Sequence, residues 1–192
     1  MGCMSLSPES IERHTLRSTV RLESSEAVGS GVILNAHCIL TAYHMVSDET
    51  LPHIFTQDKH EYVIDKLYVP KNSPLDVAVA CVKETFGEPP VTLATEMPRQ
   101  YTPIFILGQP LGIKDVMTQG NYQEDGNITA PGIWGNSGGG AFDMAGRLIG
   151  IVTSVHMQQI GPYVFVFPHL SYIEQVPDII KFLNKNHITY TV

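Results

Sequence analysis

The stretch Gly135-Asn136-Ser137-Gly138-Gly139-Gly140 places one serine in a run of six residues that contains four glycines. Glycine adopts backbone angles that residues with a β-carbon avoid, so successive amide N–H groups in such a turn can converge on one point. The hydroxyl of Ser137 could attack a carbonyl, and the amides of Gly135 and Ser137 could hold the resulting negative oxygen. A flexible glycine-rich linker is the alternative. Apolar runs of strand length at 128–130 and 148–152 flank the turn, and they favour a turn tied to a core.

Composition limits the class of protein and its partners. The chain has 192 residues, of which 43% are hydrophobic, enough for one globular unit or two small packed halves. Its formal net charge of −7 argues against nucleic acid and anionic membrane as partners, because both require a basic surface. No apolar run is long enough for a membrane span, and the N-terminus lacks the pattern of a secretory signal. We therefore expect a cytoplasmic protein.

The cysteines and histidines show no pattern of a disulfide framework or a metal site. Cys3, Cys38 and Cys81 are an odd number without paired spacing, so free thiols in a reducing compartment are expected. Cys38 and Cys81 lie in apolar runs and are expected as small core residues. No Cys/His spacing indicates a structural metal, and we expect neither a metal nor a cofactor.

Short apolar or alternating runs recur along the chain and predict an all-β fold. A proline-rich connector divides them into two sets, so two barrels fit better than one sandwich. The expected strands are 19–23, 27–34, 38–41, 53–57, 61–69 and 77–82, followed by 104–107, 115–119, 122–129, 140–142, 148–154 and 163–167.

The same division predicts the domain organisation. A short helix is expected near Ser7-Pro8-Glu9, ending by His14. Apolar residues at helical spacing predict a C-terminal helix that breaks or begins at Pro177. The expected parts are an N-terminal segment with a short helix (1–17), an N-terminal barrel (18–88), a linker (89–101), a C-terminal barrel (102–170) and a C-terminal helix with its tail (171–192).

A serine nucleophile needs a base to accept its proton and a third group to hold that base. Of the eight histidines, His44 lies on a short turn just after an apolar strand. Asp76 opens an apolar run, where a carboxylate is costly to bury without a partner such as an imidazole N–H. Taken singly, His44 could be a surface histidine and Asp76 a turn residue. Together with Ser137 they follow the His, Asp, Ser order of the chymotrypsin fold.

Four segments in combination resemble the trypsin-like serine peptidases, most closely the HtrA/Deg type and compact viral or bacterial relatives. These segments are Gly29–Leu34, Leu40–His44, Leu75–Val79 and Gly135–Gly139. The resemblance covers about residues 18–170. It implies two six-stranded β-barrels, with the site in the cleft between them, and a serine endopeptidase that acts on protein or peptide substrates.

The resemblance also implies roles for individual residues. His44 would be the general base and then the general acid, Asp76 would orient it, and Ser137 would be the nucleophile. The oxyanion hole is expected at Gly135, Asn136 and Ser137, with the amides of Gly135 and Ser137 as donors. Three departures are visible. Asn136 replaces the aspartate of trypsin, Gly140 replaces a usual proline, and the Ile-Val-Gly-Gly start of trypsin is missing, so activation by a new N-terminus is not expected.

By the same resemblance, the pocket for the side chain before the cut is expected to be lined by three segments. No acid stands six residues before Ser137, so a Lys or Arg side chain would be unpaired there. We therefore expect a shallow apolar pocket that prefers small or medium aliphatic residues. The expected lining residues are Pro131, Gly132, Ile133, Val152, Thr153, Ser154 and Val164.

Two other functions are compatible with parts of the sequence. A binding module on a decayed peptidase fold is possible on grounds of fold alone, but His44, Asp76 and Ser137 are all present. A cysteine-nucleophile relative is disfavoured, because position 137 is serine and no cysteine lies near it in the sequence. Self-processing and general protein turnover both fit the compact chain, as do a monomer and a trimer.

Overall fold

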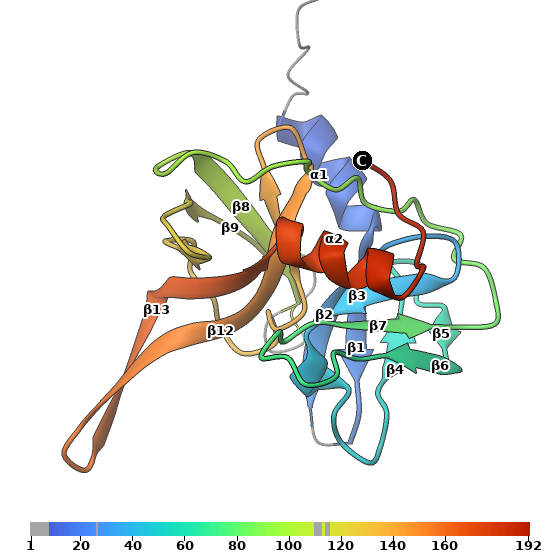
Figure 1. Ribbon diagram of the computed structural model, residues 1–192, viewed down its shortest axis with the longest axis horizontal. Helices are drawn as coiled ribbons and strands as arrows, with labels where there is room; N and C mark the ends of the chain where they lie inside the picture. The colour runs from blue at the N-terminus through green and yellow to red at the C-terminus, as the bar shows by residue number, and fades with distance from the viewer. Residues whose placement is uncertain (1–7, 26, 110–112, 114–115) are drawn as a thin grey trace, which may run out of the picture.

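In the described residues, the chain forms two antiparallel β-sheets and two α-helices (Figure 1). The structure is a computed structural model and describes residues 8–25, 27–109, 113 and 116–192. The first sheet has seven strands in the order β5-β4-β1-β2-β3-β7-β6. These strands are β1 (Thr19–Glu23), β2 (Val28–Ile33), β3 (Cys38–Thr41), β4 (His53–Phe55), β5 (Glu61–Tyr62), β6 (Lys66–Tyr68) and β7 (Ala78–Cys81).

The second sheet has six strands in the order β10-β13-β12-β11-β8-β9. They are β8 (Pro103–Gly108), β9 (Val116–Asn121), β10 (Asn127–Ile128), β11 (Gly140–Asp143), β12 (Leu148–Ile160) and β13 (Tyr163–Gln175). Asp115, expected to begin a strand, lies outside the described residues. The expected strand 122–129 is reduced to β10, because only its end pairs with β13.

The first sheet closes on itself because its two edge strands are neighbours in the sequence. β5 and β6 are the edges, yet the four Cα–Cα steps from Tyr62 to Lys66 reach at most about 14 Å. A flat sheet of seven strands would hold its edges about 29 Å apart. The expected single strand at 61–69 is therefore wrong, because the chain crosses from one edge to the other there. The double-barrel fold is confirmed, with seven strands instead of six in the first barrel.

The two barrels share part of their apolar core. One cluster lies within the first barrel and includes Leu22, Ile33 and Ile39. The other fills the second barrel and extends into the first, where Leu40 and Val79 belong to it. Ile39 and Leu40 are adjacent on β3 and enter different clusters, because successive side chains of a strand point to opposite faces. The seam between the barrels is therefore packed with side chains from both.

The helices lie at the two ends of the chain. α1 (Pro8–Arg17) continues beyond the expected end at His14. α2 (Val176–Lys185) follows β13 directly and has Pro177 in its first turn, which confirms a helix start there. Its buried residues pack into the shared cluster. None of the helices in the described parts of the chain is long and apolar enough to cross a lipid bilayer.

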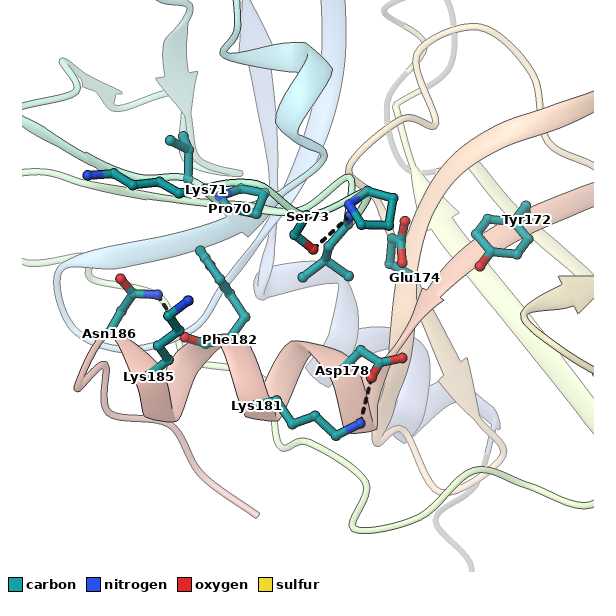
Figure 2. Close-up of a pocket in the computed structure, with 13 residues that line it drawn as sticks. Pro70, Lys71, Ser73, Tyr172, Glu174, Asp178, Lys181, Phe182, Lys185 and Asn186 are labelled. Atoms are coloured by element: carbon teal, nitrogen blue, oxygen red, sulfur yellow. Dashed lines mark hydrogen bonds and ion pairs between the residues drawn. The ribbon is translucent and has the colours of Figure 1, made fainter.

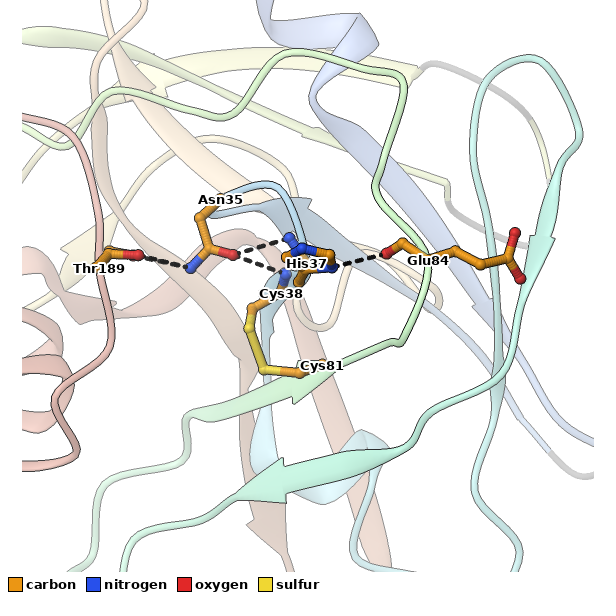
Figure 3. Close-up of a disulfide and its surroundings, with 6 residues drawn as sticks. All are labelled: Asn35, His37, Cys38, Cys81, Glu84 and Thr189. Carbon is orange, nitrogen blue, oxygen red and sulfur yellow. Dashed lines mark hydrogen bonds between the residues drawn. A yellow bond between two sulfur atoms is a disulfide. The ribbon is translucent and has the colours of Figure 1, made fainter.

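Cys38 on β3 and Cys81 on β7 lie directly opposite each other and form a disulfide (Figure 3). The expectation of free thiols is therefore wrong for these two residues, although both do lie on strands. The sequence did not predict this disulfide, because 43 positions separate the cysteines and only the register of β3 against β7 brings them together. Cys3 lies outside the described residues.

The β12–β13 hairpin is longer than expected. Each strand has 13 residues, and the hairpin projects well beyond the body of the second barrel (Figure 1). The sequence predicted only 148–154 and 163–167, because polar residues such as Gln158 and Gln159 interrupt the apolar pattern of β12.

Candidate active site

His44 and Asp76 emerge at the same end of a paired strand couple. His44 lies on the 3-10 turn η1 (Tyr43–Met45), just after β3, and Asp76 lies two residues before β7. The register places Thr41 opposite Ala78. His44, which follows Thr41, and Asp76, which precedes Ala78, therefore lie side by side. The Asp76 carboxylate accepts hydrogen bonds from His44 Nδ1 at 2.7 Å and from the His44 backbone N–H at 2.9 Å. A proton held on Nδ1 leaves Nε2 as the basic nitrogen.

The surroundings of Asp76 keep its carboxyl group ionised. Burial raises the pKa of Asp76, but the hydrogen bonds and the charge of His44 outweigh this effect and hold the pKa below its usual value of 3.8. The ionised form is therefore the one that binds the imidazole near neutral pH.

Glu174 on β13 contacts Asp76 from the second barrel. Its carboxylate accepts a hydrogen bond from the Asp76 backbone N–H at 3.0 Å. Burial raises the pKa of Glu174 and outweighs the lowering by the hydrogen bond from the Asp76 N–H, and the charges of Asp76 and Asp178 also raise it. A second carboxylate thus fixes the backbone of the residue that holds His44.

The loop that carries Ser137 is fixed between the two barrels. The Ser137 carbonyl accepts a hydrogen bond from the Ser30 N–H on β2 at 2.8 Å, and the Gly138 N–H donates to the Val152 carbonyl on β12 at 2.7 Å. Gly138 has a φ of +83°, and a β-carbon there would lie 2.0 Å from the Ser30 carbonyl oxygen. Only glycine fits at this close approach.

The side chain of Ser30 ties this loop to the first barrel. Its buried hydroxyl donates to the Gly135 carbonyl at 2.7 Å and accepts a hydrogen bond from the Gln109 N–H at 2.9 Å. The Ser30 carbonyl in turn accepts from the Thr41 hydroxyl at 2.8 Å. One residue of the first barrel thus holds the loop at Gly135 and at Ser137.

The backbone before Ser137 forms a turn that leaves two amides free. The Asn136 N–H donates to the Ile133 carbonyl at 3.0 Å, and Gly135 has a φ of +98°. A positive φ at the third position is typical of a type II turn and favours glycine. Within the described residues, the N–H groups of Gly135 and Ser137 have no intramolecular acceptor. Two such donors are what an oxyanion hole requires.

Ser137 and His44 lie on neighbouring backbone segments across the seam. A β-carbon on Gly138 would be 3.1 Å from the backbone nitrogen of Ala42, two residues before His44. Within the described residues, no hydrogen bond joins the Ser137 hydroxyl to the His44 ring. In proteases without substrate this contact is often long and tightens in the complex.

Most of the residues expected to line the specificity pocket lie close to this loop. Val152 and Thr153 are buried on β12, where the Val152 backbone pairs with Gly138 and Gly139. Gly132 is held by its N–H to the Pro168 carbonyl at 2.9 Å, and its neighbours Pro131 and Ile133 belong to the same segment. Ser154 is exposed beside them.

Val164 does not lie near the loop that carries Ser137. It pairs with Gln159 near the tip of the hairpin and is 61% exposed. Its expected position is occupied instead by Ser171, which pairs with Val155 and whose hydroxyl would lie 2.4 Å from a β-carbon on Gly132. The extra length of the hairpin accounts for the difference, because it moves residues 156–167 away from the pocket.

A cavity of about 680 Å³ lies beside the candidate site. Figure 2 shows its lining, which comes from the segment 69–75, from β13 and from α2. Glu174 and Leu75 border both this cavity and Asp76, but no residue of the loop that carries Ser137 lines it. The cavity is therefore separate from the pocket expected for the substrate.

Sequence reasoning missed three residues that the structure places at the site. Ser30 had a usable signal, since it lies in the Gly29-Ser30-Gly31 motif quoted for the family. Glu174 is the first charged residue after a charge-free run from Leu148, which could have marked it. Ser171 had no local signal, because its position depends on the length of the hairpin.

Comparison with known proteins places this site in a family. The model of the trypsin-like peptidase domain matches residues 29–151, and the chain belongs to that family. A search of curated protein sequences gives no match.

Solved structures share the fold at low sequence identity. The Rv3671c protease of M. tuberculosis H37Rv, as a serine-to-alanine mutant in an inactive form, is 20% identical with a TM-score of 0.77, over 100% of this chain and 97% of that one. A second inactive form of Rv3671c gives 20% identity and a TM-score of 0.74, over 96% and 98%. A serine endoprotease from Yersinia pestis is 21% identical with a TM-score of 0.75, over 94% of this chain and 66% of that chain.

Proposed function

We propose that the chain is a serine endopeptidase in which Ser137 is the nucleophile, His44 the base and Asp76 the residue that orients His44. The observation that carries the proposal is the double hydrogen bond from His44 to the Asp76 carboxylate. It fixes the ring and leaves Nε2 free, on a segment that borders the loop of Ser137. Metal and cofactor have no part in the proposed reaction.

The reaction would proceed through an acyl-enzyme. The Ser137 oxygen attacks the peptide carbonyl while its proton moves to His44 Nε2, and the N–H groups of Gly135 and Ser137 bind the oxyanion. His44 then gives the proton to the leaving amine as the C–N bond breaks. Water attacks the ester with His44 again as base, and the acid product leaves. Asp76 stays ionised throughout and stabilises the imidazolium.

The pocket would accept small or medium aliphatic side chains. The described segments that lie near it, from Pro131 to Ile133 and from Val152 to Ser154, carry no charged side chain. A Lys or Arg of the substrate would have no partner there. Kinetics on a peptide library that varies only the residue before the cut will test this, and a preference for Arg or Glu contradicts it.

Labelling with a serine-directed fluorophosphonate tests the reaction itself. The wild-type chain should be labelled at Ser137, the Ser137→Ala variant should not, and the Ser73→Ala variant, changed at an exposed loop serine, should be labelled like the wild type. Folding of each variant is checked by circular dichroism. A folded wild-type chain that resists labelling would favour the alternative, a peptide-binding module on the same fold.

Several expectations stay predictions. They are the domain boundaries at 18–88, 89–101 and 102–170, the absence of nucleic-acid and membrane partners, and the choice between monomer and trimer. Cytoplasmic location was expected from the N-terminal sequence, but the Cys38–Cys81 disulfide is typical of oxidising compartments. Cell fractionation with an antibody against the chain will decide the location.

A further inference from the structure

The outer part of the β12–β13 hairpin, residues 156–167, is an apolar ribbon that projects from the second barrel (Figure 1). Residues 148–173 contain no Asp, Glu, Lys or Arg, although these types make up 16% of the chain. Exposed apolar side chains are spread along the ribbon instead. Soluble proteins rarely expose a contiguous apolar surface of this kind without a binding role.

The register divides the side chains of the ribbon between two faces, because paired residues share a face and successive residues alternate. The aromatic face carries one aliphatic side chain and three rings, each between 37% and 68% exposed: Ile160, Tyr163, Phe165 and Phe167. The apolar residues of the opposite face include no ring: Met157, Val164 and Val166. The larger apolar side chains of the ribbon are therefore gathered on one side.

The second barrel reaches the aromatic face at its base. His156 lies on this face, and its ring forms a hydrogen bond with the Asn127 side chain of β10 at 2.8 Å. Toward the tip, Phe165 is 48% exposed and Tyr163 is 68% exposed. A two-stranded ribbon alone is only marginally stable in water. A surface that packs on the aromatic face would therefore stabilise the outer hairpin.

We propose that the aromatic face docks on the aromatic face of a second copy of the chain and forms a two-fold symmetric dimer. In such an interface one patch serves both copies, so the rings of one copy pack on those of the other. The two ribbons would form layers about 10 Å apart, as packed sheets do. The inference does not depend on the proposed reaction, and it adds a dimer to the monomer and trimer considered from the sequence.

Charge favours contact through the ribbon. Each chain has a formal net charge of −7, so two copies repel each other over most of their surfaces. The ribbon has no charged side chain and projects from the barrel, so two copies can meet there while their charged bodies stay apart (Figure 1). An uncharged face also offers no charge pattern that a different partner could recognise.

The area of the aromatic face agrees with a dimer. A whole aromatic side chain buries about 150–250 Å², so the exposed parts of the aromatic face amount to about 400 Å² per copy. Because interfaces are about 57–65% apolar, the full contact would cover roughly 600–700 Å² per copy. Specific interfaces bury about 600–1,000 Å² per partner. The aromatic face is thus large enough to hold two copies together.

Lipid is disfavoured as the partner of the ribbon. Amphipathic segments that lie on membranes typically combine apolar residues with Lys or Arg, which attract anionic lipids. The ribbon has neither. Deep insertion is disfavoured as well, because open sheet edges do not occur in the hydrocarbon region of membranes.

Sedimentation velocity at increasing protein concentration tests the proposal. The wild-type chain should dimerise with a Kd in the micromolar range or tighter, so the dimer should dominate at about 100 μM. In a trimmed chain, Asn-Gly replaces residues 157–166, which keeps the His156–Phe167 pair and supplies a two-residue turn. The trimmed chain should stay monomeric. A monomeric wild-type chain, or a trimmed chain that still dimerises, overturns the proposal.

Two point variants assign the interface to one face of the ribbon. Tyr163→Glu places a charge on the aromatic face, and Val164→Glu, at the next residue and with similar exposure, places it on the opposite face. Tyr163→Glu should weaken the dimer at least about tenfold, because its carboxylate would lose water without gaining a partner. Val164→Glu should change the Kd by less than about threefold. Equal weakening by both variants would contradict docking through the aromatic face.

Two further measurements separate this inference from other outcomes. Circular dichroism will show that each variant is folded. A wild-type chain that is labelled by the fluorophosphonate but is monomeric refutes the dimer and leaves the proposed function standing, and an unlabelled dimer does the reverse. In flotation with zwitterionic or anionic vesicles the chain should not bind. Vesicle binding that trimming abolishes would make the ribbon a membrane contact and overturn the proposal.

Discussion

The contact between His44 and Asp76 joins two residues 32 positions apart through both oxygens of one carboxylate. One oxygen accepts the ring N–H and the other accepts the backbone N–H, so the imidazole can neither rotate freely nor move its proton to Nε2 without losing a hydrogen bond. Loss of the carboxylate should therefore change the tautomer as well as the charge.

We expect Asp76→Asn to lower kcat by about four orders of magnitude near neutral pH. The amide NH₂ would donate to Nδ1 and leave the proton on Nε2, which could then no longer act as base. Steady-state kinetics on a cleaved peptide will measure this. Asp178→Asn is the control, because it removes a nearby carboxylate charge, paired with Lys181, and leaves both hydrogen bonds between His44 and Asp76 in place. Equal losses in the two variants would contradict a special role of Asp76.

Glu174 should make stability depend on pH in the opposite direction to Asp76. Its folded-state pKa is raised, so its ionised form destabilises the fold, and this cost disappears as the pH falls below about 4.5. Glu174→Gln keeps the acceptor for the Asp76 N–H and removes the charge. It should raise the free energy of unfolding at pH 7 by less than about 1 kcal/mol, because the site is partly solvated.

Urea denaturation at pH 7 and near pH 4 will show whether this gain vanishes in acid. The pKa of Asp76 is lowered, so its own contribution is present above pH 3.8 and is lost as the pH falls through its folded-state value. A gain from Glu174→Gln that is the same at both pH values would mean that the charge of Glu174 is not its cause.

At the scale of elements, the pairing of β3 with β7 determines where the site forms. The same register that brings Cys38 opposite Cys81 brings Thr41 opposite Ala78, so the disulfide and the His44–Asp76 contact lie at opposite ends of one strand pair. The disulfide is therefore expected to stabilise the scaffold without touching the reacting groups.

Replacing both cysteines by alanine should lower the free energy of unfolding by about 2–4 kcal/mol, because the disulfide closes a long loop in the unfolded chain. Denaturation with and without dithiothreitol will measure the effect. The reductant should destabilise the wild type and leave the double variant unchanged. Sensitivity of the double variant to reductant would assign the effect to another part of the chain.

For the whole molecule, the decisive feature is the seam between the barrels. Ser30 spans it, because its backbone binds the Ser137 carbonyl while its hydroxyl binds Gly135 and Gln109 of the second half. The shared apolar cluster holds the barrels together, and these hydrogen bonds set the position of the nucleophile loop relative to His44.

Ser30→Ala should lower the free energy of unfolding by about 1–3 kcal/mol, since it leaves a buried donor and a buried acceptor unpaired. It should also lower kcat more than it changes KM, because the turn of Gly135 loses its anchor. Thr41→Val removes a buried hydroxyl bond in the same seam without touching Gly135, and it should mainly affect stability. Equal losses of kcat in both variants would contradict the anchoring role.

The local sequence was enough for most of the elements and for naming His44, Asp76 and Ser137 as the proposed reacting groups. Alternating apolar residues predicted most of the strands, Pro177 marked a break or start of the C-terminal helix, and the glycines at 135–140 predicted a turn with backbone angles that other residues avoid. These features depend on backbone angles and on neighbours a few residues away, so they can be read without knowing the fold.

Contacts between distant strands were decided by the tertiary structure alone. The Cys38–Cys81 disulfide, the hydrogen bonds of Ser30 and Glu174, and the exchange of Val164 for Ser171 beside Gly132 all depend on register across pairs that are far apart in the sequence. Register is set by how the barrels close and by the length of each hairpin. A shift of one residue turns every side chain of a strand to the other face, and the local pattern does not fix that choice.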